Sequence, residues 1–576
     1  MTLPAGSRAA GFDGGPAGRS APVAAPSVVA ARRRVIVAAS VGTVFEWYDF
    51  YLYGTLATLF ATRFFGGVEP GSAFALALLA FAAGFVVRPL GALVFGRLGD
   101  LLGRKDTFRI TLVVMGLATF TVGLLPTYET IGLAAPVALV GLRLLQGLAL
   151  GGEYGGAVTY AAEHAPPGRR GLTTAWIQTT ATLGLLLSLL VVTATHAVLG
   201  DEDFADWGWR VPFLLSVVLL AVGSWIRRST TESPVFQRLK ERGQEATSPV
   251  RDSFARWGNL RLVLLALFGL VAGQAVVWYT GQFYALVYLQ SVLQVDPMTA
   301  GTVVATALLV ASPAFVLFGA LSDRIGRKPV FLAGLLLACL SIFPLYRAMT
   351  QAANPALARA QQTVPVVVHA DPAGCSFQGS PVAREVDFTT DCDIARRALA
   401  RHAVHHLFEP LPPGVTGFVE VAGQRLPLPA VVLASGGHRF ENESVLALRR
   451  FQHEVGDALV TAGYPDAPPR IQALSADWWH LVAVLATLVL VVAMVYGPTA
   501  ATLAELFPAR VRYTSMSLPY HLGNGWFGGL MPSIAFALAA GRGDPLQGLW
   551  YAVIVAGISF VVGLFALPET LGRRLD

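Results

Sequence analysis

The sequence GRLGDLLGRK at residues 96–105 recurs as GALSDRIGRK at residues 319–328, an offset of 223. Glycine, aspartate, glycine, arginine and lysine match between the two copies. Long apolar runs lie on both sides of each copy, and about 20 consecutive apolar residues are enough for a helix to cross a bilayer. The repeat therefore predicts a membrane protein built from two equivalent halves, which is typical of secondary transporters.

The composition agrees with lipid as the solvent for most of the chain. Of the 576 residues, 54% are hydrophobic and 14% are charged, whereas soluble domains carry about 25% charged residues. The apolar runs are continuous rather than alternating, which favours helices over a membrane β-barrel. Twelve spans are predicted, at residues 34–61, 73–97, 107–126, 133–162, 171–199, 209–227, 260–290, 299–321, 329–349, 477–506, 513–540 and 546–567.

Basic residues gather in every second connection between these spans. Residues 104–105, 169–170 and 227–261 carry arginine or lysine, whereas residues 201–203 on the other side are acidic. The positive-inside rule then predicts a multi-pass protein of the cell inner membrane with both termini in the cytoplasm. Loop arginines explain the net charge of +6, so membrane lipid and not nucleic acid is the expected partner.

A second repeat locates an insertion in the second half. Residues 163–170 (EHAPPGRR) match residues 505–512 (ELFPARVR) at an offset of 342, which exceeds the first offset by 119. The polar stretch 351–475 accounts for the difference and falls outside the cytoplasm. The predicted fold is an all-α membrane protein of twelve transmembrane helices in two six-helix bundles, with an inserted small α/β extracytoplasmic domain.

The domain boundaries follow from the same patterns. They are a disordered tail at 1–31, an N-terminal bundle at 32–227, a cytoplasmic linker at 228–258, the first three helices of the C-terminal bundle at 259–350, the insertion at 351–475, the last three helices at 476–570 and a tail at 571–576.

Within the insertion, strands are expected at 364–369, 415–421 and 426–434, and helices at 391–408 and 443–462. An oxidising compartment permits a disulfide between Cys375 and Cys392, although two free thiols fit the sequence equally well. His402, His405 and His406 lie on the predicted helix 391–408. We interpret them as a solvated face and predict no metal site.

The repeated motif has a physical interpretation as a cytoplasmic gate. Its glycines allow tight turns and close helix contacts, and its carboxylates can pair with arginine or cap a neighbouring helix. The alternative is a plain basic loop that sets topology. The predicted gate residues are Gly96, Asp100, Gly103, Arg104, Lys105, Asp323, Gly326, Arg327 and Lys328.

Together with RLLQG at residues 143–147, the motif resembles the major facilitator superfamily. The stretches FEWYDF at 45–50, RPLG at 88–91, GGEY at 151–154 and WRVPF at 209–213 are similar to its metabolite:proton symporter family. That family includes carriers of proline and betaine, shikimate, 2-oxoglutarate and citrate. The resemblance covers residues 34–349 and 477–570 and leaves out the insertion.

Charged residues at membrane depth are costly and mark functional sites by default. Glu46, Asp49 and Tyr53 share one helix face, and the resemblance implies a coupling role for this stretch without fixing which acid carries the proton. Proton coupling is expected at Glu46, Asp49, Arg143 and Glu153, and solute binding at Tyr53, Arg88, Gln274, Trp278 and Tyr279. Structural charge pairing and aromatic packing are the alternatives for these positions.

The sequence thus predicts a proton symporter that imports a small polar metabolite, an organic acid or zwitterion, by alternating access. It predicts no enzyme and no cofactor. No Gly-Lys dipeptide is present, which argues against a nucleotide-driven transporter as far as this chain goes. The expected partners are a small-molecule solute, protons and lipid, and the chain is expected to be a monomer. A proton-driven exporter of the same fold, or a membrane-anchored sensor that works through residues 351–475, remains as an alternative.

Overall fold

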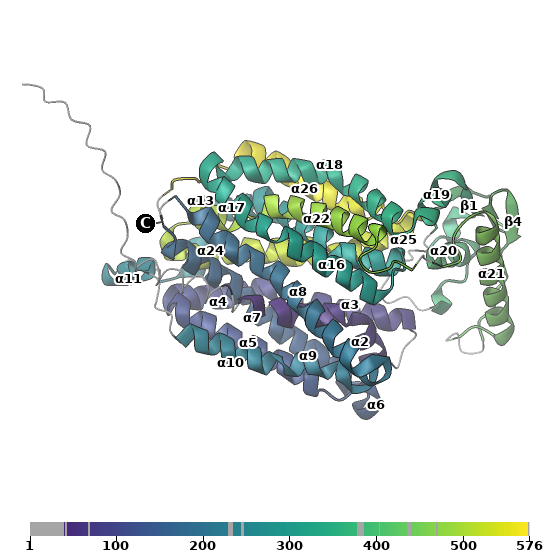
Figure 1. The fold of residues 1–576 in the computed structure, drawn as a ribbon, viewed down its shortest axis with the longest axis horizontal. Coiled ribbons are helices and arrows are strands. Elements are labelled where there is room, and N and C mark those ends of the chain that lie inside the picture. Colours follow the sequence, from purple (N-terminus) through teal and green to yellow (C-terminus); the bar gives the residue numbers. More distant parts are fainter. Residues whose placement is uncertain are drawn as a thin grey trace, which may run out of the picture.

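The computed structural model describes residues 40, 43–45, 47–66, 70–166, 168–228, 234–243, 247–376, 385–402, 404–434, 439–467, 470–573 and 575. Their helices lie lengthwise in one bundle, with a smaller α/β part at one end (Figure 1). We call residues 43–228 the N-half, and residues 257–353 with 476–566 the C-half. The motif end of the bundle carries residues 96–105 and 319–328.

The N-half is helical at 47–55 and continues through long helices joined by short turns. Its elements are α2 (Ala57–Phe64), α3 (Pro70–Val86), α4 (Arg88–Leu101), α5 (Arg104–Leu124), α6 (Tyr128–Ile131), α7 (Ala134–His164), α8 (Arg170–Asp203), η1 (Phe204–Gly208), α9 (Arg210–Leu214) and α10 (Ser216–Arg228). The short helices α11 (Pro234–Glu241) and α12 (Pro249–Phe254) lie between the halves in the sequence.

In the C-half, π-helical turns interrupt two of the spans, whereas the π-helical η1 of the N-half lies at the end of a span. Its elements are α13 (Trp257–Ala266), η2 (Leu267–Val271), α14 (Ala272–Trp278), η3 (Tyr279–Tyr284), α15 (Ala285–Val287), η4 (Tyr288–Val292), α16 (Pro297–Ala311), α17 (Pro313–Ile325), α18 (Arg327–Ala353), α22 (Ala476–Tyr496), α23 (Thr499–Leu506), η7 (Ala509–Val511), α24 (Arg512–Leu522), η8 (Gly523–Gly528), α25 (Met531–Arg542) and α26 (Leu549–Ala566).

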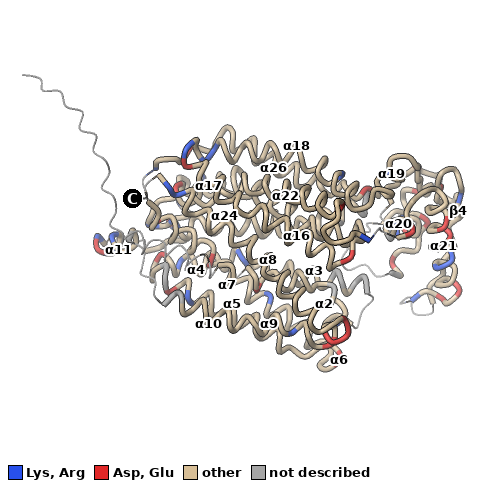
Figure 2. Tube along the Cα trace, viewed as in Figure 1, with Lys and Arg blue, Asp and Glu red and all other residues tan. Residues whose placement is uncertain are grey.

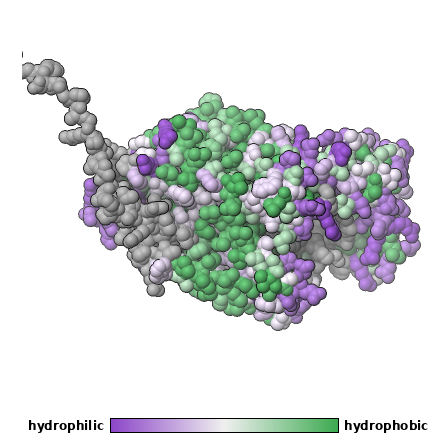
Figure 3. Space-filling model, in the orientation of Figure 1, coloured by the Kyte–Doolittle hydropathy of each residue, from purple (hydrophilic) through white to green (hydrophobic). Residues whose placement is uncertain are grey.

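Within the described residues, nine helical stretches are long and apolar enough to cross a membrane, and Arg210–Trp225 is a shorter apolar helix. An apolar band crosses the face of the bundle that Figure 3 shows. Charged residues gather at its two ends and over the α/β part (Figure 2). Small residues bring helices close together: a methyl group at Gly147 or Gly151 of α7 would collide with the backbone of Gly84 or Arg88. Inside lipid the hydrophobic effect does not drive helices together, so close packing contacts of this kind stabilise their association.

Residues 351–475, which we call the 351–475 segment, contain the α/β part. Helix α19 (Pro355–Thr363) leads to strand β1 (Val366–Ala370), and the sheet has the order β2-β1-β3-β4. β1 and β2 (Leu407–Pro410) are parallel and joined through α20 (Asp391–Arg401), whereas β3 (Phe418–Val421) pairs antiparallel with β1 and with β4 (Gln424–Pro427). Helix α21 (Asn442–Thr461) and the short η5 (Pro372–Gly374) and η6 (Glu385–Asp387) complete it. Cys375 and Cys392 form a disulfide.

Three predictions in this segment are wrong at one end. The strand expected at 415–421 begins at Phe418. The helix expected at 391–408 stops at Arg401, since residues 407–410 pair with β1 as strand β2. The strand expected at 426–434 stops at Pro427, and Leu433 forms an isolated bridge with Phe440. His406 consequently does not belong to a solvated helix face: it is 5% exposed.

His406 instead joins the 351–475 segment to the C-half. Its backbone nitrogen donates to the carbonyl of Gly543, 3.2 Å away, at the turn after α25. Gly543 has a φ of +69°, and its Cα faces the His406 ring so closely that a methyl group would clash. Burial lowers the pKa of His406 to about 4.

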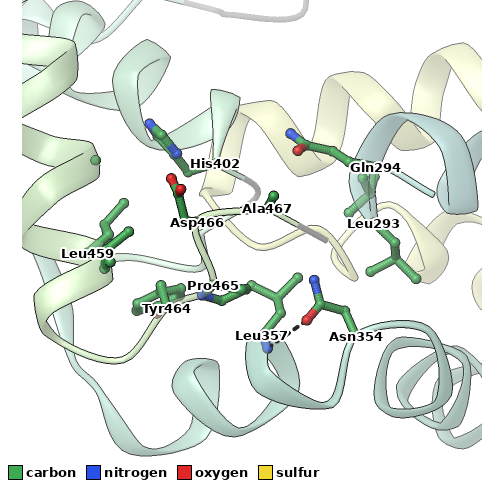
Figure 4. Close-up of a pocket in the computed structure, with 13 residues that line it drawn as sticks. Leu293, Gln294, Asn354, Leu357, His402, Leu459, Tyr464, Pro465, Asp466 and Ala467 are labelled. Carbon is green, nitrogen blue, oxygen red and sulfur yellow. Dashed lines mark hydrogen bonds between the residues drawn. The ribbon is translucent and has the colours of Figure 1, made fainter. Parts of the chain in front are cut away.

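A pocket of about 50 Å³ lies at a second junction of the same parts (Figure 4). His402, Tyr464 and Asp466 line it from the 351–475 segment, together with Asn354, the C-cap residue of α18 at the start of that segment. Gln294, two residues beyond η4, lines it from the C-half. All the helix ends at these two junctions belong to the C-half.

Candidate functional site

At the motif end, each repeated aspartate caps a helix of the opposite half. Asp100 accepts hydrogen bonds from the backbone nitrogen and the hydroxyl of Thr514, near the start of α24, at 2.9 and 2.7 Å. Asp323 accepts from the backbone nitrogens of Gly171 and Leu172, near the start of α8, at 2.8 and 2.7 Å. A carboxylate there satisfies free N–H groups and faces the positive end of the helix dipole. The two caps join the N-half to the C-half.

Ion pairs between the halves follow the same symmetry. Arg512 donates to Glu163 at 2.8 Å, and Arg170 lies 3.4 Å from Glu505. These are the positions that match at the offset of 342. The two ion pairs are therefore equivalent by the internal repeat, and each joins a glutamate of one half to an arginine of the other half.

Arg327 connects the caps to the ion pairs. It donates to Asp323 at 2.7 Å and to Glu505 at 3.1 Å while only 1% exposed. Glu569, beyond α26, accepts from the backbone nitrogens of Arg327 and Lys328 at 3.0 and 3.1 Å. Burial acts to raise the pKa of Glu569, but backbone hydrogen bonds outweigh it, so the net pKa lies below its usual value. Glu569 therefore stays ionised beside the network.

The other predicted gate residues lie around these contacts. Gly96 packs against the backbone of α24. Gly103 and Gly326, with φ of +119° and +106°, occupy equivalent turns before α5 and α18. The backbone of Arg104 and Lys105 opens α5, but their side chains lie outside the described residues.

Two arginines of the N-half meet in the middle of the bundle. Arg88 opens α4, Arg143 lies on α7, and each is 1% exposed. The ring of Phe50 lies 4.2 Å from the Cζ atom of Arg88 and 4.7 Å from that of Arg143. Arg143 also donates to Gln146 at 2.6 Å.

Neither arginine is neutralised by a carboxylate within the part of the chain that the structure describes, and the Nε and Nη2 atoms of both lack hydrogen-bond partners there. Contacts with aromatic faces compensate such charges only in part. A buried cation without a counter-charge is costly. Among the described residues, the two arginines at the centre of the bundle therefore have no carboxylate that compensates their charge.

Aromatic rings from both halves surround this charge. Trp47 stacks on Tyr51 at 5.5 Å, and Tyr51 stacks on Trp278 of α14 at 5.9 Å between ring centroids. Trp47 also lies 5.7 Å from the Cζ atom of Arg88. Among the described residues, the hydroxyl of Tyr51 and the indole nitrogen of Trp278 have no hydrogen-bond partner. Polar atoms and flat apolar faces thus occur together, as in sites for small ligands.

The structure brings only some of the expected residues to this place. Arg88, Trp278 and Tyr279 lie together, and Asp49 is buried beside Phe50 in the chain. Glu153 is buried on α7. Glu46 lies outside the described residues.

Tyr53 and Gln274 have other partners. The ring of Tyr53 lies 4.6 Å from the Cζ atom of Arg143, and its hydroxyl donates to the carbonyl of Ala77 at 2.9 Å. Gln274 exchanges amide hydrogen bonds with Asn524 at 3.4 and 3.3 Å, within the C-half.

Residues outside the predicted set of site residues complete the centre. The hydroxyls of Tyr496 and Tyr520 lie 2.7 Å apart, and Gln178 donates to the carbonyl of Tyr496 at 2.9 Å. Tyr154 stacks on Tyr520. His521, next in α24, is 1% exposed. The sequence feature that could have identified His521 is its position inside an apolar span, because ionisable residues are uncommon within membrane-spanning segments.

Residues 39–358, more than half of the chain, match the family model of the Major Facilitator Superfamily. The chain belongs to the Major Facilitator Superfamily. It is a multi-pass membrane protein, and its relatives are transporters, not enzymes. The superfamily assignment confirms the resemblance found in the sequence.

Two relatives of this superfamily member come from Escherichia coli strain K12. The proline/betaine transporter is 36% identical over 314 residues, which is 52% of this chain and 62% of the relative's length. The shikimate transporter is 36% identical over 323 residues, 55% of this chain and 72% of that relative.

The fold of this superfamily member is similar to that of a solved structure of the proton:xylose symporter XylE. The TM-score is 0.55 at 16% identity, and the match covers 95% of this chain and 98% of that one. A partially occluded inward-open structure of XylE from E. coli gives 0.54 over 95% and 100% of the two chains. These likenesses establish the fold.

Proposed function

We propose that this member of the superfamily is a proton-coupled secondary carrier that imports a small polar metabolite bearing a carboxylate, either an organic acid or a zwitterion. The observation that carries the proposal is the pair of buried arginines, Arg88 and Arg143, without a carboxylate partner among the described residues. An anionic solute supplies the missing charge. Proline, betaine and shikimate, after which the relatives are named, each bear a carboxylate.

The proposed architecture has twelve spans in two bundles of six. To the nine long apolar stretches we add residues 43–64, 210–228 and 512–542. The motif end faces the cytoplasm of the cell inner membrane together with both termini. The 351–475 segment is an inserted α/β domain on the outer side, and the chain acts as a monomer in lipid.

Transport is proposed to follow alternating access. The caps and ion pairs of the motif end hold the cytoplasmic side closed, while contacts such as Thr182 to Gln282, at 3.0 Å, join the halves farther from it. Solute contacts are assigned to Tyr53, Arg88, Gln274, Trp278 and Tyr279, and proton coupling to Glu46, Asp49, Arg143 and Glu153.

Uptake in proteoliposomes tests the coupling. With an imposed pH gradient, acid outside, labelled proline, glycine betaine or shikimate is expected to accumulate, and collapse of the gradient is expected to stop it. Asp49→Asn is expected to reduce accumulation at least ~10-fold, because one titratable acid contributes on the order of 10²–10⁴ in proton-transfer steps, but to retain exchange of labelled for unlabelled solute.

Asp203→Asn, at an exposed aspartate of α8, is the matched control and should transport normally. Uptake that is unchanged after the gradient is collapsed would rule out proton symport.

The docking contacts further suggest that the 351–475 segment moves with the C-half. Both junctions, at Gly543 and at the pocket near Gln294, involve C-half helix ends. Movement of the N-half relative to the C-half then leaves both contacts between the segment and the C-half unchanged.

Gly543→Ala is expected to weaken the contact between the 351–475 segment and the C-half. The substitution adds a methyl group against His406 and places alanine at a φ of +69°, which costs about 1–2 kcal/mol. Deuterium exchange of residues 404–410 should therefore rise at least ~5-fold. Because the pKa of His406 falls from 6.5 to about 4 on docking, docking is complete above pH 6.5 and weakens as the pH falls towards 4.

The control is Gly557→Ala on α26, where a methyl group meets nothing within 4 Å. Equal exchange in both variants would show that Gly543 does not hold the segment.

A further inference from the structure

His521 is a buried histidine that the proposed transport cycle does not yet use. It lies on α24 in the C-half, is 1% exposed, and both Nδ1 and Nε2 lack a hydrogen-bond partner among the described residues. Buried polar atoms are nearly always paired, and each exception requires an explanation. Packing does not supply one, because a leucine would fill this space without two orphaned nitrogens.

The neighbours of His521 show what it faces. Helix α24 packs along α4 in antiparallel register. Gly96 of α4 lies against Thr514, and the carbonyl of Phe85, just before α4, lies against Gly525, just beyond α24. This register places Arg88 of the N-half opposite His521 of the C-half, across the interface between the halves.

We propose that Arg88 and His521 bind the same carboxylate group of the solute, one from each half, and that His521 determines specificity for a carboxylate. The inference rests on the proposed function and names the ligand group of that same site. A guanidinium binds both oxygens of a carboxylate through its fork of N–H groups, and the imidazole contributes a further N–H donor.

The chemistry excludes the other solute classes at this position. A cationic head group would be repelled by Arg88, and an alcohol or ester offers no charge to compensate the guanidinium. A carboxylate held between the halves also draws them together, because its two partners belong to different rigid units. Such a solute favours the closed form by its differential affinity for it.

Equilibrium binding with matched solute pairs tests the inference. The pairs are glycine betaine with choline, and shikimate with its methyl ester, which differ at the carboxylate. Binding to the purified full-length chain in lipid nanodiscs is measured by calorimetry without a pH gradient. His521→Leu is expected to weaken binding of the carboxylate member at least ~10-fold and to change binding of its partner less than ~2-fold. His521→Gln, which keeps an N–H donor, should restore part of the loss.

His480→Leu, at an exposed histidine of α22, is the control and should bind as the unmodified chain does. Equal losses for both members of a pair in His521→Leu would show a structural role and overturn the inference. Unchanged binding, or no preference of the unmodified chain for either carboxylate, would overturn it as well. Since the assay needs no gradient, failed proton coupling in liposomes would leave a positive result standing.

Discussion

Arg327→Leu is expected to open the motif end in most molecules and to slow uptake at least ~10-fold. The substitution removes the cation that lies between Asp323 and Glu505 at 2.7 and 3.1 Å. Removing one partner of a buried ion pair costs about 3–5 kcal/mol. Both carboxylates keep other donors, so we expect the lower end, about 3 kcal/mol. That value shifts the closed-to-open equilibrium ~100-fold.

Distances between spin labels across the motif end measure this shift. Exposed Leu102 of the N-half and exposed Arg510 of the C-half, each changed to cysteine, are suitable positions. Longer distances are expected in Arg327→Leu. The control is Arg324→Leu, an exposed arginine of the same turn, which should keep the short distance. An unchanged distance in Arg327→Leu would show that other contacts keep this end closed.

The two repeated aspartates show how much of the network at the motif end the sequence predicts. The offset of 223 marks Asp100 and Asp323 as equivalent, and both cap helices across the interface. The offset of 342 marks Glu163 and Glu505 in the same way. Their partners are not predictable, because a repeat shows which positions are equivalent but not which surfaces meet.

The central site is less predictable because helix periodicity fails in it. Gln274, Trp278 and Gln282 are spaced by four, a spacing that places residues on one face of a regular α-helix. The π-helical η3 begins at Tyr279 and turns the later residues of this span to a different face. Gln274 consequently pairs with Asn524 in the C-half, whereas Gln282 accepts from Thr182 in the N-half.

Tertiary pairing likewise decides the end of α20. Residues up to 408 have helical character in sequence, but Leu407 and Phe408 align with β1 and extend the sheet. Four backbone residues in a ladder, with His406 buried against Gly543, outweigh one more helical turn. Local propensity is a weak prior against such contacts.

Arg88→Gln is expected to lower uptake at least ~100-fold, the largest loss at any single solute contact proposed here. Glutamine keeps polar atoms at the site but removes the charge, and hydrogen bonds to charged groups contribute about 1.5–3 kcal/mol each. Arg88→Lys should not restore uptake, because an ammonium group lacks the planar fork that grips both carboxylate oxygens. Proteoliposome uptake of labelled proline, glycine betaine and shikimate measures both variants. Arg97→Gln, at an exposed position of the same helix, should transport normally.

The unfolding temperature of Arg88→Gln distinguishes a role of Arg88 in solute binding from a role in folding. Without solute, Arg88 is a buried cation whose Nε and Nη2 atoms are unsatisfied among the described residues. Replacing a buried charge by a neutral group is often neutral or stabilising, so Arg88→Gln should unfold at an equal or higher temperature than the unmodified chain. Residues kept for binding commonly cost stability in this way. A large drop in the unfolding temperature together with lost uptake would instead mean that Arg88 holds helices α4 and α7 together, and the carboxylate assignment would then lose its main support.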